Sequence, residues 1–549
     1  MRSLILAALA AASPGARAAQ PAVHFDWFEY SSHDENRTIE KPPGVYSNPI
    51  LPGYYPDPAI ERVGDKFYLV NSTFAHWPGI PIHESTDLVN WRLIGYALTD
   101  PGKFSFDGLG ISRGVFAPSI HHHEGTFYII NTLVDAGGNF FVTAKNPAGP
   151  WSDPVWLKEI DGIDPSFFFD AGGKTFILNN GAPEGKPQYE GHRAIWMQEY
   201  DLAARKLIGP RRVIVNGGAD PSKKPIWIEG PHLYFINGWY YLMCAEGGTG
   251  FDHSEVVFRS KSVWGPYAPY EHNPILTQRD LMKVRMVPVT STGHADLVQR
   301  ADGSWWSVFL GTRPYAKGLY NTGRETFLLP VKWRDGWPVI LPKGEPVPIF
   351  LDIRTGMPAP DPLPRFGLAD ARDNFDNSAP GPEWLQIHVP KQTWFDTTTR
   401  KGYLTIRPLE VRLDAMRNAS FLARRQQDTQ FSAYASLEVP TAAGISAGIA
   451  VFQNETHWYF FGLRRDGDQL LPFVERRDGE KSATIRGQAF APKKSALLIV
   501  EGSGGHYSFQ YNAGAGAKMV LEDDDATFLS TEKAGGFVGT VLGPYARQD

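Results

Sequence analysis

The run KFYLVNSTF, residues 66–74, is the first of five aromatic, β-prone runs that recur along the chain. The others are TFYIINTL (126–133), KTFILNNG (174–181), WYYLMCAEG (239–247) and WWSVFLGT (305–312). A shorter apolar stretch and a turn such as VGD, HEG or ADG precede each run, which is a hairpin pattern. Five ordered repeats of roughly 50 to 65 residues predict a five-bladed β-propeller. A β-sandwich with unrelated hairpins is the alternative, and it leaves the regular order unexplained.

Composition supports a β-rich protein of more than one domain. The chain has 549 residues, which is too many for one core and predicts two or three domains. It contains 55 Gly and 44 Pro residues, and 13% of its residues are aromatic, as expected for short strands, turns and sugar-binding surfaces. The formal net charge of −5 provides no large basic field, so we expect no nucleic-acid partner.

The first 18 residues, MRSLILAALAAASPGARA, have the pattern of a secretory signal peptide. Arg2 gives a positive start, an apolar run follows, and Ala16-Arg17-Ala18 has the form of a cleavage site. No later stretch approaches the roughly 20 continuous apolar residues of a membrane span. We therefore expect an exported protein, periplasmic or extracellular, with no membrane span.

The short stretch that opens each repeat carries the candidate chemistry. The innermost strand of each propeller blade lines the central channel, so the five openings should meet at one end of the axis. The first is NPILPGYYPDPAI (48–60), in which two prolines restrict the backbone around one aspartate. The five openings carry Asp57, Ala117, Asp164, Glu229 and His294. Three carboxylates from different blades are therefore predicted to converge.

Converging carboxylates indicate a function because like charges raise one another's pKa and cost stability. A single Asp-Pro pair would be an ordinary turn. Together, three carboxylates suit glycoside hydrolysis. In that reaction one carboxylic acid protonates the leaving oxygen, and a second carboxylate activates water or attacks carbon.

Several of these stretches together resemble glycoside hydrolase family 43, most closely its β-xylosidase and α-L-arabinofuranosidase branch. They include NPILPGYYPDPAI, GIDPSFFFD (162–170), IEGPHLYFINGWYYLMCAEGGT (228–249), GHADLV (293–298) and GRETFLLPVKWRDGWPV (323–339). The resemblance spans roughly residues 46 to 350, and the family has a five-bladed propeller. It implies inversion by a single displacement, with Asp57 as general base and Glu229 as general acid. Asp164 would tune and orient Glu229.

The resemblance also implies a sugar subsite. Arg324 in GRETF matches an arginine that binds the sugar near the catalytic carboxylates, and an ordinary ion pair is the alternative. Phe74 and Thr249 match residues that line the same pocket. His294 matches a histidine near the axis that in some relatives lies by a calcium or other ion; a core hydrogen-bonding role is the alternative. Phe116 stands where many relatives have tryptophan, which could alter the sugar preference.

The C-terminal part predicts a second β domain. We expect the propeller over 45–352, a proline-rich linker over 353–370 and a β-sandwich over 371–549, which resembles the sandwich that accompanies this branch. In relatives a loop of the sandwich closes one side of the pocket and contributes an aromatic residue. Phe537 in GGFVG is the candidate here, with an ordinary core position as the alternative.

Together with the resemblance to this family, the sequence predicts an all-β, exo-acting, inverting glycosidase. It would release a terminal pentose, β-1,4-linked xylose or α-L-arabinofuranose, from hemicellulose or its oligosaccharides. No cofactor is required, although a calcium ion could lie near the axis with His294 as a ligand. The alternatives are an endo-arabinanase-like hydrolase and a non-catalytic carbohydrate-binding propeller.

Overall fold

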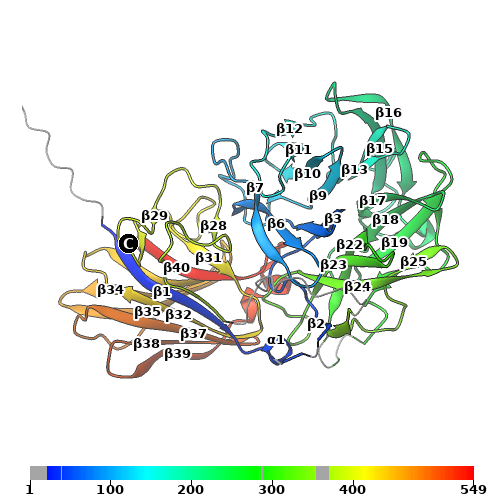
Figure 1. Ribbon diagram of the computed structural model, residues 1–549. Helices are drawn as coiled ribbons and strands as arrows, with labels where there is room; N and C mark the ends of the chain where they lie inside the picture. Colours follow the sequence, from blue (N-terminus) through cyan, green and yellow to red (C-terminus); the bar gives the residue numbers. More distant parts are fainter. Residues whose placement is uncertain (1–20, 39, 42, 283–284, 286–287, 354–369) are drawn as a thin grey trace, which may run out of the picture.

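The computed structural model describes residues 21–38, 40–41, 43–282, 285, 288–353 and 370–549. The predicted signal peptide (1–18) and nearly all of the predicted linker (353–370) lie outside these residues. Regular structure in the described part is almost entirely β, in two lobes (Figure 1). The helical elements there are short: α1 (Glu35–Thr38), α2 (Thr531–Ala534) and two 3₁₀ turns (Pro221–Lys223 and Thr527–Leu529). None of the described helices has the length and apolar character needed to cross a membrane.

Five antiparallel sheets among the described residues form the propeller, so this prediction is confirmed. The first blade contains β3 (Ala59–Val63), β4 (Lys66–Val70), β6 (Gly79–Ser85) and β7 (Arg92–Leu98). The second contains β8 (Gly114–Val115), β9 (Ser119–His123), β10 (Thr126–Val134), β11 (Gly138–Ala144) and β12 (Val155–Trp156). The third contains β13 (Ile163–Phe169), β14 (Thr175–Gly181), β15 (Ala194–Asp201) and β16 (Lys206–Asn216). The fourth contains β17 (Glu229–Ile236), β18 (Trp239–Glu246), β19 (Ser254–Ser260), β20 (Ala268–Pro269) and β21 (Leu276–Thr277). The fifth contains β22 (Thr290–Gln299), β23 (Trp305–Thr312), β24 (Glu325–Arg334) and β25 (Trp337–Val339).

Each blade follows from the repeat seen in the sequence. The quoted aromatic runs become β4, β10, β14, β18 and β23, and each pairs with the short strand before it through a tight turn. The two faces of each blade pack against neighbouring blades, so these strands are buried on both sides; all seven residues of β14 are buried, including the polar Asn179 and Asn180. A two-stranded sheet of β2 (Val45–Ser47) and β26 (Phe350–Asp352) brings the two ends of the propeller segment together.

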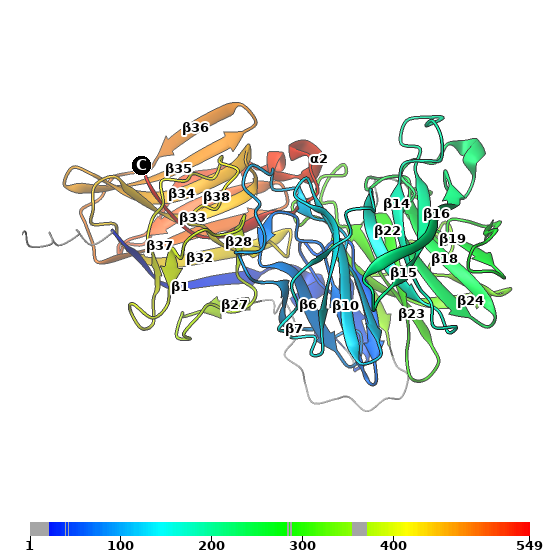
Figure 2. The ribbon, with the colours of Figure 1, turned by 90° about the horizontal axis from the view of Figure 1, so that it is seen from above.

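The second lobe is a β-sandwich of two large sheets (Figure 2). One sheet contains β29 (Phe395–Asp396), β30 (Leu404–Ile406), β1 (Val23–Ser32), β32 (Gln430–Glu438), β37 (Ser495–Ser503), β38 (His506–Asn512) and β39 (Ala517–Asp525), with β27 (Asp370–Asp373) also on β1. The other contains β36 (Lys481–Arg486), β35 (Gln469–Asp478), β34 (His457–Asp466), β33 (Ile445–Asn454), β40 (Val541–Gln548), β31 (Leu422–Arg425), β28 (Leu385–Ile387) and β5 (His76–Trp77). The predicted sandwich is confirmed.

Two strands cross between the lobes, and the sequence pattern predicted neither crossing. β1 precedes the propeller in the chain but lies between β30 and β32 of the sandwich. β5 belongs to the propeller segment but extends the second sandwich sheet through β28. One apolar core runs across both lobes; it includes Val70 and Phe74 of the propeller and Phe452 and Tyr545 of the sandwich. The sandwich therefore shares its core with the first two blades of the propeller.

Candidate active site

The innermost strands share one backbone distortion where the candidate residues lie. Asp57, Asp164 and His294 all adopt left-handed φ angles, of 51°, 55° and 54°, and Gly230, next to Glu229, has φ 56°. The register of β13, β17 and β22 shifts at these positions. A left-handed non-glycine residue costs roughly 1–3 kcal/mol and persists where the surrounding structure holds it, often at functional sites. The same distortion in four blades marks this end of the axis.

Asp57 lies against Arg324 and Ser72. The Nη1 atom of Arg324 is 2.7 Å from Oδ1 of Asp57, and Nη2 is 3.4 Å from Oδ2. The Ser72 hydroxyl donates a 2.5 Å hydrogen bond to Oδ2. Burial alone would raise the pKa of Asp57, but Arg324, His294 and the Ser72 bond outweigh it and hold the pKa below its ordinary value. Asp57 is therefore ionised at neutral pH, as a general base must be.

Glu229 has the opposite character. Its side chain is buried, and the residue as a whole is only 8% exposed. Burial first, and then the charges of Asp164 and Asp57, raise its pKa to about 8, although His294 and Arg324 act in the other direction. The group therefore holds its proton at neutral pH, as a general acid must.

Asp164 and His294 lie beside Glu229. The backbone N–H of Gly230 donates to Oδ2 of Asp164 at 3.2 Å, and Nε2 of His294 is 3.7 Å from the same oxygen. Burial lowers the pKa of His294, but the close contact with Asp164 and the negative charges of Asp57 and Asp164 outweigh it, and the pKa is about 9. An imidazolium at this position balances the carboxylates around it.

His294 is the one residue predicted to bind a metal ion. Its Nδ1 atom is buried and has no hydrogen-bond partner among the described residues. Throughout the residues that the structure describes, no group of three or more His, Cys, Asp or Glu side chains is arranged to hold a metal. Calcium takes six to eight oxygen ligands, and one imidazole that carries a proton at neutral pH does not supply them. The described side chains therefore offer an ion near the axis one imidazole, that of His294, and no cluster of protein ligands.

An aromatic cluster lies beside the Asp57–Arg324 pair. The rings of Phe74 and Phe537 are stacked, with centroids 5.8 Å apart and planes at 19°. Phe116 meets Phe74 edge-on at 5.1 Å and Phe537 at 5.8 Å. The guanidinium carbon of Arg324 lies 5.8 Å from the Phe74 centroid and 5.7 Å from the Phe537 centroid. Four of the predicted sugar-site residues are thus brought together with Asp57.

Phe537 comes from the sandwich, in the loop between α2 and β40. Its backbone N–H donates to Ser112 Oγ of the propeller at 2.9 Å. Further along the loop, the N–H of Thr540 donates to the carbonyl of Asn321 at 2.8 Å. A Cβ at Gly323 would lie 2.8 Å from Gly539, so the loop runs directly against the segment that leads to Arg324.

Thr249 is the predicted residue that the contacts do not join to this cluster. It is half-buried in the loop after β18, and no contact among the described residues links it to the three carboxylates. Sequence reasoning missed Ser72, although it lies within the first quoted run. It also missed His253, which is fully buried and donates from Nδ1 to the Ser291 carbonyl at 3.0 Å. Burial is the main cause that lowers the pKa of His253 to about 3.

An ionised carboxylate paired with an arginine beside an aromatic wall, and a buried carboxylic acid that keeps its proton at the same end of the axis, are the groups that glycoside hydrolysis requires. The model of Glycosyl hydrolases family 43 matches residues 46–338, and that of the Beta xylosidase C-terminal Concanavalin A-like domain matches 372–549. The chain belongs to glycoside hydrolase family 43 and is a glycosidase.

Relatives match over nearly the whole chain. A xylosidase/arabinosidase of Butyrivibrio fibrisolvens is 37% identical over 91% of this chain and 96% of its own. A non-reducing end α-L-arabinofuranosidase of Bacteroides ovatus is 35% identical over 91% of each chain. The crystal structure of a GH43_12 retrieved from a capybara gut metagenome superimposes with a TM-score of 0.89, at 39% identity, over 96% of this chain and 100% of the other.

Proposed function

We propose that this protein is an exo-acting, inverting glycosidase that releases a terminal pentose, β-1,4-linked xylose or α-L-arabinofuranose, from hemicellulose or its oligosaccharides. The observation that carries the proposal is the opposite protonation of two buried carboxyl groups, with Asp57 ionised on Arg324 and Glu229 protonated. The names of the two relatives, a xylosidase/arabinosidase and a non-reducing end α-L-arabinofuranosidase, support the choice of sugar.

The proposed reaction is a single displacement. Glu229 gives its proton to the glycosidic oxygen as the bond from that oxygen to the anomeric carbon breaks. Asp57 takes a proton from a water molecule, whose oxygen forms the new bond to the anomeric carbon from the opposite face. The products are a pentose of inverted configuration and a shortened alcohol. Asp57 then releases its proton and Glu229 regains one from solvent, which restores both groups without a cofactor.

The surrounding residues support these two steps. Arg324 keeps Asp57 ionised, and the charge of Asp164 raises the pKa of Glu229. The positive charge of His294 limits how far the pKa of Glu229 rises. A calcium ion near the axis stays a prediction with His294 as its one candidate protein ligand, and no step of the reaction depends on it.

The aromatic cluster supports exo action. Phe537 and its loop come from a different lobe and pack onto Phe74 and Phe116 beside Asp57, which would block a polymer from passing through on that side. An endo-arabinanase-like hydrolase would need that side open. A non-catalytic sugar-binding propeller would use the aromatic rings but would have no need of two carboxyl groups held in opposite protonation states.

The test is release of nitrophenol by the purified protein from the aryl β-D-xylopyranoside and the aryl α-L-arabinofuranoside, followed by product analysis on oligosaccharides. Single pentoses are the expected product. Dominant cleavage of one aryl substrate assigns the sugar, and Phe116→Trp tests whether this aromatic position sets the preference. Release of oligomers would favour endo action, and no release from any substrate would favour the binding function.

Export is part of the same proposal, because xylan and arabinan-rich polymers lie outside cells. The pattern of residues 1–18 supports cleavage after Ala18. N-terminal sequencing of the protein recovered from the periplasm or the medium of the producing cells would test it. A mature protein that keeps residues 1–18 and stays inside the cell would contradict it.

A further inference from the structure

The segment Gly53–Asp57 carries the proposed general base, and all five of its residues lie outside any strand. Leu51 makes an isolated bridge to Thr326, and β3 begins only at Ala59. Asp57 lies at the end of this segment with a left-handed φ of 51°. The direction of its carboxylate therefore depends on the contacts that hold the backbone between these points.

The propeller holds one side of the segment. The N–H of Tyr55 donates to the carbonyl of Arg324 at 3.0 Å. The N–H of Gly53 donates to Oε1 of Glu325 at 2.7 Å. The amide of Asn71 donates to the carbonyls of Tyr55 and Pro56, both at 3.0 Å. Arg324 and Glu325 thus hold the backbone that carries Asp57, and Arg324 also pairs with the carboxylate of Asp57.

The sandwich holds the other side. Nε of Arg425, the last residue of β31, donates to the Tyr54 carbonyl at 2.7 Å, and Nη1 donates to the Tyr55 hydroxyl at 3.2 Å. The guanidinium carbon lies 4.0 Å from the Tyr55 ring centroid. The next residue, Gln426, places its carbonyl 2.8 Å from where a Cβ of Gly53 would lie, and Gly53 has φ 85°, so this contact requires glycine.

Arg425 is a buried cation that forms no ion pair with any described residue. It is 4% exposed, and its neighbours are the aromatic rings of Tyr54, Tyr55 and Tyr96. By contrast, buried Arg313 is paired with Glu325, at 2.7 Å. A buried charge without a carboxylate partner is costly, and an apolar side chain of similar size would fill the space without that cost. Packing alone therefore does not account for an arginine here.

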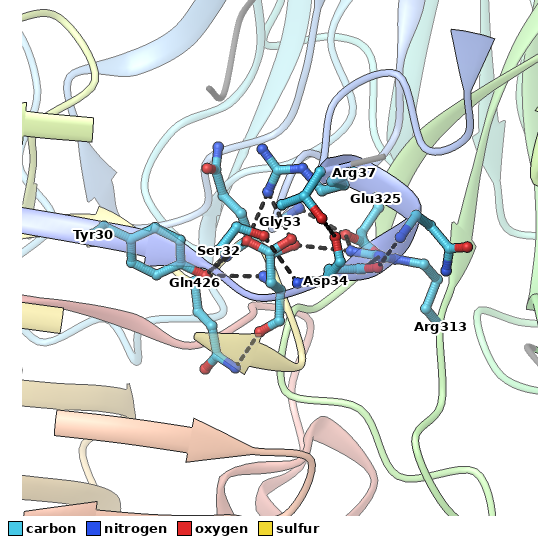
Figure 3. A network of polar contacts seen from close by, with 12 residues as sticks. Tyr30, Ser32, Asp34, Arg37, Gly53, Arg313, Glu325 and Gln426 are labelled. Atoms are coloured by element: carbon cyan, nitrogen blue, oxygen red, sulfur yellow. Dashed lines mark hydrogen bonds and ion pairs between the residues drawn. The ribbon is translucent and has the colours of Figure 1, made fainter. Parts of the chain in front are cut away.

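The neighbouring polar network joins the same elements (Figure 3). Arg313 of the propeller donates to both oxygens of Glu325 at 2.7 and 2.8 Å and to the Gln427 carbonyl at 2.8 Å. It also contacts Asp34, just after β1, at 2.8 Å. Glu325 in turn accepts from Gly53. Gln427 of the sandwich and Asp34 of the N-terminal segment are thus linked through Arg313 and Glu325 to Gly53, in the segment that carries Asp57.

We propose that Arg425 is a positioning residue, which reaches from the sandwich to hold the backbone of Tyr54 and Tyr55 and so keeps Asp57 on Arg324 in the geometry that activates water. The inference rests on the proposed function of Asp57 as general base. It gives the sandwich a second part in the reaction, separate from the contribution of Phe537: one lobe carries the base, and the other lobe fixes where it points.

The test compares Arg425→Met and Arg425→Lys with Arg424→Met as the matched control. Arg424 is the preceding residue of the same strand, and its contacts are with Glu383 at 3.6 Å and the Trp384 ring at 5.4 Å, both in the sandwich. A misplacement of about 1 Å at a reacting group can lower the rate about 10²-fold. We expect Arg425→Met to lower kcat by about that factor while KM changes far less. Arg425→Lys should recover part of the loss, and Arg424→Met should match the wild type.

The pH profile separates positioning from a general loss of stability. As Asp57 loses its close pairing with Arg324, its pKa should rise, and the acid limb of kcat/KM should move to higher pH. His294, His253 and Glu229 also face Asp57, but none of them contacts Arg425. A wild-type kcat and acid limb in folded Arg425→Met would overturn the proposal. So would a loss of activity with an unmoved acid limb, because the pairing of Asp57 with Arg324 would then be unchanged and the loss would have another cause.

A crystal structure of Arg425→Met, or of Arg425→Lys if the methionine variant does not fold, gives a readout independent of activity. We expect the 53–57 segment to shift and the Asp57–Arg324 contact to lengthen beyond about 4 Å, the range in which an opposite charge acts strongly. An unchanged segment would overturn the proposal. If the wild type hydrolyses neither aryl pentoside, the proposed function fails on that result, while the crystal structure still decides whether Arg425 positions Asp57.

Discussion

Replacing Glu229 by glutamine should make the protein more stable, by an amount that grows with pH. Burial and the charges of Asp164 and Asp57 raise the pKa of Glu229 to about 8, from an ordinary value of 4.5. The folded protein thus keeps a proton that the unfolded chain releases at much lower pH. Glutamine has nearly the same shape and no proton to release, so the variant removes this difference and little else.

The sign follows from proton linkage. Below pH 4.5 both states hold the proton, and Glu229 imposes no penalty. Between pH 4.5 and about 8 the unfolded chain ionises while the folded protein does not, so the free energy of unfolding falls as pH rises. Above pH 8 the penalty is complete. Each pKa unit corresponds to about 1.4 kcal/mol, so Glu229→Gln should gain at most ~5 kcal/mol at pH 9, ~3 kcal/mol at pH 7 and almost nothing at pH 4.

The assay is urea unfolding followed by tryptophan fluorescence at pH 4, 7 and 9, on wild type and variant in parallel. Glu522→Gln is the matched control, because Glu522 is exposed on β39 and its replacement should change stability equally little at every pH. The reasoning is refuted if the difference between Glu229→Gln and wild type is the same at pH 4 and pH 9, or if the variant is the less stable protein at pH 9.

Three further changes test the roles of single residues. Glu229→Ala should slow hydrolysis of natural oligosaccharides by roughly 10²–10⁴-fold and that of a nitrophenyl glycoside much less, since nitrophenolate leaves without a proton; equal losses on both would exclude Glu229 as the general acid. Arg324→Met should raise the pKa of Asp57 and move the acid limb of kcat/KM to higher pH, and an unmoved limb would show that Arg324 does not hold that charge. Phe537→Ala should lower kcat/KM about 2–10-fold, mainly through KM, as expected for one aromatic contact; an unchanged KM would place Phe537 outside the sugar site.

The propeller was predictable because its signal is local. Each aromatic run, turn and short opening strand lies within one stretch of chain, and the five copies became β4, β10, β14, β18 and β23 with their partners. The sandwich was predictable for the same reason, from strands and turns in succession. Sequence-distant pairing leaves no such signal, which is why the positions of β1 and β5 in the sandwich were missed.

The site was predictable in its residues but not in its contacts. The repeat pointed to Asp57, Asp164, Glu229 and His294 because they open equivalent strands, and their roles stay predictions. The protonation of Glu229 depends on burial and on charges from other blades, which only the folded chain brings together. The contact of Arg425 with Tyr54 joins residues 371 positions apart, and nothing near either residue in the sequence indicates it.

The position of β1 also governs the order in which the molecule can be completed. The strand is made first, but its partners β30 and β32 follow only after the whole propeller has been synthesised, about 400 residues later. Until then its ladder groups have no partners in the sandwich. A fragment that began at β27 would leave a gap between β30 and β32, with two open edges prone to pair with other chains. The sandwich is thus not a domain that can be detached from the end of this protein: the N-terminal strand makes the propeller an insertion within it, and both lobes must be finished together.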